Sequence, residues 1–407
     1  MEPLLYLVHR MPFPPNKGDK IRSYHLLRHL AERYAVHLGT FVDMVEDLVH
    51  VPQLEAHCAS LHVETLDPRA ARLRSVSGFL TGEALTLPYY RNSALRSWVR
   101  RVVAQQGIRK AVVFSGAMEQ YVKDLHLRVV LDFVDVDSAK WSEYAKRQSW
   151  PSSFVYRREG NRLLSFERAA ARRSAASVFV TEPEAELFGR LAPECRGRLH
   201  VIEMGVNTDY FAPHVERVSP FETGEMPIVF TGAMDYWPNI DAVTWFAMKV
   251  MPQILRARPN ARFYIVGMNP APAVEMLVSR PGVVVTGTVP DVRPYLQHAA
   301  AVVAPLRVAR GMQSKVLEAM AMARPVVVSP AASTGVRGAV GHDFEVAESP
   351  EEFARKVLAV LEPGAGKEIG WRARARIVSE YSWARNLAHF DRLLDGDQQS
   401  ATFGLAH

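Results

Sequence analysis

The stretch AVVAPLRVARGMQSKVLEAMA, residues 301–321, joins a strand, a glycine-bearing loop and the start of a helix. Residues 301–305 form an apolar run of strand length, and the residues after the loop open a helix. Gly311, in the loop, lets the backbone approach a ligand closely. Because the first N–H groups of a helix are unpaired and its dipole is positive there, the unit is suited to hold a phosphate.

Two charged side chains on this helix indicate what such a phosphate would belong to. Lys315 lies in the first turn and adds a point charge, and Glu318, three residues on, shares its helix face. A diphosphate at the helix start would place a sugar hydroxyl near Glu318, whose carboxylate accepts hydrogen bonds. The same spacing also fits an ordinary surface Lys–Glu pair on a buried helix.

The alternation of apolar, strand-like runs and helical patterns continues through most of the chain, which predicts an α/β protein with doubly wound parallel sheets. The strand candidates are Leu4–Val8, Val36–Phe41, Ala111–Ser115, Val129–Phe133, Ser177–Val180, Ile228–Gly232, Arg262–Gly267, Val283–Gly287, Ala301–Pro305 and Pro325–Ser329.

A proline-containing stretch, Pro213–Pro227, interrupts this alternation and reads as a linker. We therefore predict one α/β domain over residues 1–213, a linker over 214–227 and a second α/β domain over 228–381. An amphipathic helix follows over 382–396, and residues 397–407 form a tail.

Composition and charge limit the class of protein without deciding it. Hydrophobic residues make up 48% of the chain and charged residues 23%, as in ordinary globular proteins. The two cysteines, Cys58 and Cys195, are isolated, which favours a reduced, cytoplasmic compartment over a zinc or disulfide framework. We expect neither a signal peptide nor a membrane span. The net charge of +6 permits anionic partners, but a generally basic protein fits as well.

A turn-rich loop, Pro12–Arg22, follows the first predicted strand. Gly18 gives it a flexible point, and Lys17, Lys20 and Arg22 add positive charge at another helix start. Because the loop follows the first strand and is long for a simple turn, we predict that it carries function. The alternative is an ordinary connection with solvated lysines.

In the second half, Gly232 and Asn239 lie just after the strand Ile228–Gly232, at the end of a parallel strand where ligands bind. Tyr236 and Trp237, in the same loop, could stack on a base or sugar, although packing is the commoner role of such aromatics.

Three aspartates, Asp132, Asp135 and Asp137, alternate at the end of the strand Val129–Phe133. Loops at such positions carry function. Asp135 and Asp137 could bind sugar hydroxyls or deprotonate an acceptor, which would make them catalytic. The alternative is that they cap the helix that follows.

The segment around Lys315-Val-Leu-Glu-Ala-Met-Ala321 resembles the donor-site signature of the retaining family 4-like glycosyltransferases. The resemblance implies GT-B architecture, in which two Rossmann-like domains face a cleft, the second binding the nucleotide sugar. It also implies that Glu318 binds the donor ribose and that Lys315 contacts the diphosphate. Arg310 stands where relatives often have a Glu that contacts the donor sugar, so Arg310 or Arg307 would add phosphate charge instead.

Further segments extend the resemblance to about residues 3–395 and imply that the helix over 382–396 packs back across the domains. It implies donor contacts for Gly232 and Asn239, and places Gly18 under the donor phosphates and beside the acceptor. The string Asp135-Val-Asp-Ser-Ala-Lys-Trp141 resembles a bacterial subgroup associated with PEP-CTERM/exosortase exopolysaccharide systems. Since GT-B enzymes of this group do not use an Asp-x-Asp metal site, we expect no metal there.

The sequence thus predicts a hexosyltransferase-like, metal-independent, retaining glycosyltransferase without a cofactor. It would move a sugar from a UDP- or GDP-sugar to a glycan or lipid-linked acceptor in bacterial exopolysaccharide or cell-surface polysaccharide biosynthesis. We expect a cytoplasmic protein with no nucleic-acid partner. A peripheral contact with the inner membrane, through basic helices around Arg91–Lys110 and Arg157–Arg173, is a further hypothesis.

Two other functions stay open at this point. A nucleotide-sugar 2-epimerase shares the architecture and would use Asp135 or Asp137 as an acid/base group, whereas a catalytically degenerate relative would act in binding or assembly. The chain has no Gly-x-Gly-x-x-Gly after a strand, no Gly-x₄-Gly-Lys-Ser/Thr and no Gly-x-Ser-x-Gly. This argues against a nicotinamide enzyme, a P-loop NTPase and an α/β-hydrolase.

Overall fold

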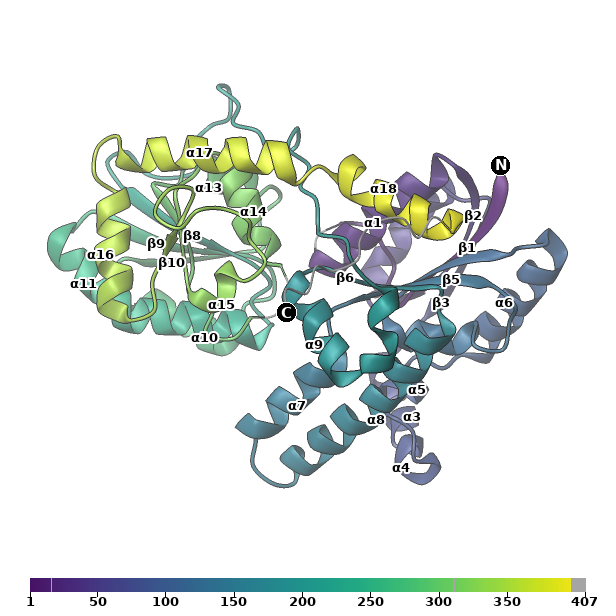
Figure 1. Ribbon diagram of the computed structural model, residues 1–407. Coiled ribbons are helices and arrows are strands. Elements are labelled where there is room, and N and C mark those ends of the chain that lie inside the picture. The colour runs from purple at the N-terminus through teal and green to yellow at the C-terminus, as the bar shows by residue number, and fades with distance from the viewer. Residues whose placement is uncertain (16, 310–311, 397–407) are drawn as a thin grey trace. The chain divides into compact units, whose positions relative to one another are not determined.

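The computed structural model describes residues 1–15, 17–309 and 312–396, which form two compact units. Unit 1 comprises Met1–Glu203 and the segment that begins at Ala384, and unit 2 comprises Met204–Trp383. Each unit has a sheet flanked by helices (Figure 1). The division thus falls earlier than the predicted linker. Within unit 2, residues 214–225 contain turns but neither helix nor strand.

In the described part of unit 1, seven parallel strands form one sheet in the order β3-β2-β1-β4-β5-β6-β7. The strands are β1 (Glu2–Val8), β2 (Tyr34–Val42), β3 (Ser60–Thr65), β4 (Lys110–Phe114), β5 (Arg128–Val134), β6 (Ala176–Phe179) and β7 (Leu199–Val201). The α-helices are α1 (Gly18–Ala31), α2 (Val51–Glu55), α3 (Pro68–Ser75), α4 (Ser77–Thr81), α5 (Thr86–Tyr89), α6 (Ser93–Gln106), α7 (Asp137–Arg147), α8 (Ser152–Arg173), α9 (Glu182–Leu191) and, near the end of the chain, α18 (Trp383–Asp395).

In the described part of unit 2, six parallel strands form a second sheet in the order β10-β9-β8-β11-β12-β13. The strands are β8 (Met226–Thr231), β9 (Ala261–Val266), β10 (Val283–Gly287), β11 (Ala301–Ala304), β12 (Val326–Val328) and β13 (Glu345–Val346). The α-helices are α10 (Trp237–Trp245), α11 (Met251–Ala257), α12 (Pro272–Glu275), α13 (Arg293–His298), α14 (Ser314–Ala321), α15 (Pro330–Ser333), α16 (Pro350–Val360) and α17 (Ala365–Glu380).

The central strands consist of continuous apolar runs because helices cover both faces of a parallel sheet. All of residues 4–8 in β1, for example, are completely buried. In both sheets the strand order reverses at one point, between β1 and β4 in unit 1 and between β8 and β11 in unit 2. Ligands of doubly wound sheets bind beyond the carboxyl ends of the strands at such a reversal, which fixes where a site is to be sought.

The last helix, α18, returns to unit 1. It buries Leu387, Phe390 and Leu394, the residues whose helical spacing predicted it. Asp391 accepts a hydrogen bond from His29 on α1 at 3.1 Å and pairs with Arg33, just after α1, at 2.9 Å. The predicted helix therefore packs on unit 1, and Figure 1 shows α18 beside α1.

Candidate functional site

In unit 2, one cation and one amide meet at the strand reversal. Lys315, in the first turn of α14, donates a hydrogen bond from Nζ to Asn239 Oδ1 on α10 at 2.7 Å. Asn239 Nδ2 in turn donates to the carbonyl of Ala233 at 2.8 Å. Because that second bond fixes the amide, its oxygen stays turned toward the ammonium group.

Two glycines at the ends of β8 and β9 leave the room for this arrangement. A Cβ on Gly232 would lie 2.8 Å from Asn239 Nδ2 and 2.9 Å from Lys315 Nζ, and the residue has a φ of +156°. A Cβ on Gly267 would lie only 1.6 Å from the carbonyl oxygen of Gly232. Neither position accepts a side chain without moving backbone or the cation.

The ammonium group of Lys315 is held in surroundings that disfavour its charge. It lies 4.1 Å from the centroid of the Phe230 ring, whose face attracts cations. Burial nevertheless lowers the pKa of Lys315 to about 7, and the nearby Glu318 carboxylate only partly opposes this shift. An anion bound at this point would favour the ammonium form.

The pKa of Glu318, one turn along α14, is shifted in the opposite direction. Burial raises its pKa to about 7, against the influence of Lys315. Two partly buried groups whose pKa values are shifted toward neutrality, at the reversal point of a parallel sheet, mark a candidate functional site. The structure thus brings Lys315, Asn239 and Gly232 into one place, with Glu318 electrostatically coupled to them.

The other cations predicted for this site have different positions. Arg310 and Gly311 lie outside the described residues. Arg307 is ion-paired with Asp241 through Nε and Oδ2 at 2.9 Å. Arg307 and Asp241 line an open groove of about 530 Å³ together with Trp237, Ile240, Thr244, Trp245, Met248, Lys249 and Ala273. Of the two predicted stacking aromatics, Trp237 therefore borders this groove, which Lys315 and Glu318 do not line.

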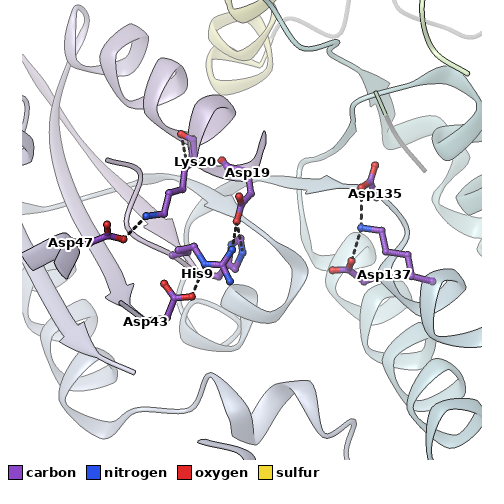
Figure 2. A network of polar contacts seen from close by, with 10 residues as sticks. His9, Asp19, Lys20, Asp43, Asp47, Asp135 and Asp137 are labelled. Carbon is purple, nitrogen blue, oxygen red and sulfur yellow. Dashed lines mark hydrogen bonds and ion pairs between the residues drawn. The ribbon is translucent and has the colours of Figure 1, made fainter. Parts of the chain in front are cut away.

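In unit 1, a charged cluster lies directly beyond β1, at the other strand reversal (Figure 2). Arg10 donates from Nη1 to Asp19 at 2.8 Å and from Nε to Asp43 at 2.9 Å. His9 Nε2 lies 3.6 Å from the same Asp19 oxygen. The His9 ring stacks on Phe114, with 5.9 Å between ring centroids.

Burial dominates the electrostatics of this cluster. It lowers the pKa of His9, although Asp19 opposes the shift, so the ring is neutral at physiological pH. Burial would raise the pKa of Asp19, but His9 and Arg10 outweigh it and keep the carboxyl below its usual range. Within the described residues, His9 Nδ1 and Asp43 Oδ1 are buried without a hydrogen-bond partner. The cluster therefore has unused hydrogen-bonding capacity.

The sequence prediction missed His9, Arg10 and Asp43. A usable signal was present, because His9 and Arg10 directly follow the run Leu4–Val8, and Asp43 directly follows β2. Both places are carboxyl ends of adjacent parallel strands, where the same rule that selected Gly232 applies.

The loop after β1 needs a correction. Lys20 is 2% exposed and pairs with Asp47, and Arg22 is completely buried against Asp132 at 2.8 Å. Arg22 also donates to the carbonyl of Ile202 at 2.8 Å. Both cations are ion-paired with internal carboxylates, so neither side chain is placed to contact a phosphate or acceptor.

Lys17 and Gly18, in contrast to Lys20 and Arg22, are not buried in the protein. Lys17 is partly exposed at the N-cap of α1. Gly18 follows it, and a Cβ there would have no protein atom within 4 Å. The fold itself therefore does not require a glycine at position 18.

Asp135 and Asp137 follow β5, where Val134 has a φ of +70° and the strand register shifts. A β-branched residue in this conformation is strained, as often found at functional sites. Both aspartates pair with Lys140 Nζ, at 2.9 Å for Asp135 and 3.1 Å for Asp137. Burial would lower the pKa of Lys140, but the two carboxylates raise it well above its usual range.

The alternative that these aspartates cap α7 is wrong. The carboxylate of Glu184 accepts from the Val136 N–H at 2.7 Å, and that of Glu167 accepts from the Ser138 N–H at 3.1 Å. Distant glutamates thus satisfy the helix start. Asp135 Oδ1 is buried with no hydrogen-bond partner among the described residues, so it can accept one from a ligand.

The position of Lys140 bears on whether Asp135 and Asp137 could hold a metal ion. Its ammonium group already occupies the position between the two carboxylates. Across residues 1–15, 17–309 and 312–396, no group of three or more His, Cys, Asp or Glu side chains is arranged to hold a metal ion. In the same ranges, every helix is too short or too polar to cross a membrane.

Comparisons with known proteins place this geometry in a family context. Residues 226–363 match the model of the family described as glycosyl transferases group 1. No curated protein matches the chain significantly.

Solved structures share the fold over nearly the whole chain. Sucrose-phosphate synthase from Thermosynechococcus elongatus is 17% identical with a TM-score of 0.72, covering 97% of this chain and 99% of its own. HepE of Anabaena in complex with UDP-glucose is 13% identical with a TM-score of 0.68, covering 97% and 100%. WaaG, a glycosyltransferase involved in lipopolysaccharide biosynthesis, is 14% identical with a TM-score of 0.64, also covering 97% and 100%. The chain therefore has the predicted GT-B fold.

Proposed function

We propose, for a glycosyltransferase whose group 1 domain spans residues 226–363, that the donor is a UDP- or GDP-sugar and the acceptor a glycan or a lipid-linked sugar. The observation that carries this proposal is the partly buried Lys315 ammonium at the start of α14. Its hydrogen bond goes to the neutral amide of Asn239, and its pKa is lowered to about 7 by burial. A diphosphate would supply the missing negative charge.

In this proposal the donor binds along α14. The diphosphate lies at the helix start, where free N–H groups and the helix dipole favour an anion, and Lys315 pairs with it. Glu318, one turn along, accepts hydrogen bonds from the ribose hydroxyls. Gly232 leaves the space beside Lys315 in which the phosphates approach backbone.

The transfer step uses these groups to stabilise the leaving group. As the bond between the sugar C1 and the phosphate oxygen breaks, the electron pair moves to the diphosphate, and Lys315 and the helix start stabilise the growing charge. The acceptor oxygen attacks C1 from the same face and its proton passes to the leaving phosphate. The configuration is retained, and no metal or enzyme nucleophile takes part.

Unit 1 supplies the acceptor-side groups in this proposal. Asp135 is held by Lys140 and has one buried oxygen without a partner among the described residues, which suits it to orient an acceptor hydroxyl. Asp137 shares Lys140 and helps fix its position. Because both carboxylates are already ion-paired, we propose positioning of the acceptor rather than proton removal as their role.

Similar proteins support the biological setting. The HepE structures hold UDP, UDP with glucose, and UDP-glucose, and WaaG acts in lipopolysaccharide biosynthesis. We therefore propose bacterial exopolysaccharide or cell-surface polysaccharide synthesis at the cytoplasmic face of the inner membrane. The proposed PEP-CTERM/exosortase setting rests on the resemblance of the string Asp135–Trp141 alone.

The test is a thermal-shift screen of UDP, GDP and other nucleoside diphosphates on the wild type and on Lys315→Met and Glu318→Gln. We expect one base to raise the Tm of the wild type and both variants to lose most of that shift. The exposed Lys249→Met and Glu275→Gln are matched controls in unit 2 and should respond like the wild type. If no nucleotide shifts the wild type, or all variants respond equally, the donor site is elsewhere.

Turnover separates the transferase from its alternatives. With the selected UDP- or GDP-sugar and a lipid extract as acceptor, we expect nucleotide release that depends on the acceptor. Conversion of the sugar nucleotide without acceptor would instead indicate an epimerase. Binding without any turnover would indicate a binding protein.

A further inference from the structure

Unit 1 exposes an unusual number of large apolar side chains on two short helices. On α3 and α4, Leu73 is 77% exposed, Val76 56%, Phe79 42% and Leu80 91%. Single exposed apolar residues are normal, but four within eight residues of sequence are unusual. An exposed apolar patch on a protein surface marks an interaction site.

Exposed apolar side chains also occur at the start of α8. Trp150 and Phe154 are 81% and 60% exposed and lie four residues apart. One turn further, Arg158 donates to the carbonyls of Gly78 at 2.6 Å and Glu83 at 3.1 Å, and its guanidinium group lies 4.7 Å from the Phe79 ring centroid. Figure 1 shows α4 and the α7–α8 hairpin projecting from the same side of the unit 1 sheet.

The connection between the two elements is firm. Glu159, which is 2% exposed, accepts hydrogen bonds from the N–H groups of Leu85 and Thr86, at 2.5 and 2.9 Å. Together with the Arg158 contacts, these bonds fix α4 to the first turns of α8. Six exposed apolar side chains thus lie on segments that are held together, and we call this set the α3–α8 face: Leu73, Val76, Phe79, Leu80, Trp150 and Phe154.

The charges around this face are mainly positive. Residues 68–82 contain Arg69, Arg72 and Arg74 and no Asp or Glu, and Arg157 on α8 is exposed as well. Acidic residues border this range at both ends: Asp67 caps α3 and accepts from the Arg69 N–H at 2.8 Å, and Glu83 pairs with Arg91 at 2.7 Å. The face is thus apolar in its centre and positive at its edge.

We infer that the α3–α8 face binds the surface of an anionic lipid bilayer. Exposed Leu, Phe and Trp side chains enter the boundary between headgroups and acyl chains, and the arginines pair with lipid phosphates. A second copy of this chain would bring the same positive edge against itself, which disfavours a symmetric dimer through this face. The inference deepens the proposed peripheral membrane contact and assigns it to residues other than the basic helix α6.

The test is co-sedimentation of the full chain with vesicles of phosphatidylcholine alone or mixed with phosphatidylglycerol, at low and high salt. We expect binding only to the anionic vesicles, weakened by salt. Leu80→Asp and the double variant Arg69→Glu/Arg72→Glu should each lower the partition coefficient at least about tenfold. Val215→Asp, at a completely exposed apolar residue of unit 2, and Arg100→Glu/Arg101→Glu on α6 should bind like the wild type.

Three outcomes would overturn the inference: no sedimentation of the wild type with anionic vesicles, equal binding by the α3–α8 variants, or loss of binding in the α6 variant. Size-exclusion chromatography tests the alternative that a second copy of this chain binds the α3–α8 face. A wild-type dimer that Leu80→Asp dissociates would show a protein interface instead. The nucleotide-induced Tm shift, measured without vesicles, should persist in every one of these variants. Failure of the membrane contact is thereby distinguished from failure of the donor site.

Discussion

At the residue scale, the distinctive feature is the pair of partly buried groups on α14, Lys315 and Glu318. In the unliganded protein both act against folding. The pKa of Lys315 is lowered from 10.5 to about 7, so the unfolded chain binds the extra proton and stability rises with pH between these values. The pKa of Glu318 is raised from 4.5 to about 7, so stability falls as pH rises through that range. Such costs are typical of groups kept for ligand binding.

These pKa values predict how donor binding depends on pH. The bound diphosphate needs the Lys315 ammonium, so affinity should fall by up to about tenfold per pH unit above pH 7. The ribose hydroxyls need the Glu318 carboxylate, so affinity should also fall below pH 7. Calorimetric titration with UDP-glucose, whose diester phosphates do not titrate here, should therefore give a maximum near neutrality.

Two variants test which group causes the loss of affinity on each side of pH 7. Lys315→Arg keeps its charge at all accessible pH values and should lose the alkaline decline while retaining measurable affinity. Glu318→Gln cannot ionise and should lose the acidic decline. A profile that both variants leave unchanged would show that neither group titrates on binding.

At the element scale, the sequence predicted the central strands well and the edge strands poorly. The central strands are continuous apolar runs because both of their faces are covered. The missed strands are β3, which is only partly buried, β7 with three residues and β13 with two. The fourth edge strand, β10, is also half-exposed but was predicted, because its residues Val283–Val285 form an apolar run. The other three lack the length or the apolar pattern on which the prediction depended.

The site was predicted where its chemistry is local in sequence. Lys315 and Glu318 lie three residues apart on one helix, and Gly232 directly follows a strand. The prediction was wrong for Arg22 because its partner, Asp132, is 110 residues away. Burial of a cation by a distant carboxylate depends on the tertiary fold, which local spacing does not encode.

Glycines at strand ends and helix starts allow an element-scale prediction. Gly267→Ala places a methyl group 1.6 Å from a carbonyl oxygen, and should destabilise unit 2 by more than about 3 kcal/mol in denaturant unfolding. Gly18→Ala and Gly197→Ala meet no atom within 4 Å and should change stability by less than about 1 kcal/mol.

Donor affinity should distinguish Gly18 from Gly197, although alanine at either position should leave stability nearly unchanged. If Gly18 is kept for ligand approach, Gly18→Ala should weaken binding of the UDP- or GDP-sugar, whereas Gly197→Ala should not. Equal affinities in the two variants would remove Gly18 from the donor site.

At the scale of the whole molecule, each unit has its own core, and α18 packs the end of the described chain against unit 1. Phe390 on α18 is completely buried and lies 5.9 Å from the Arg22 guanidinium carbon. Phe390→Ala should therefore cost about 3–5 kcal/mol in unit 1. Hydrogen exchange should speed up in β1, α1 and α18, because those elements lose their shared packing.

The matched change in unit 2 is Phe353→Ala, at an equally buried residue of α16. It should speed exchange in unit 2 and weaken the protection that UDP confers on β8 and α14, whereas Phe390→Ala should leave that protection in place. This contrast follows because Lys315, Asn239 and Glu318 all belong to unit 2. Loss of UDP protection in Phe390→Ala, with exchange in unit 1 unchanged, would mean that α18 stabilises the donor site rather than unit 1.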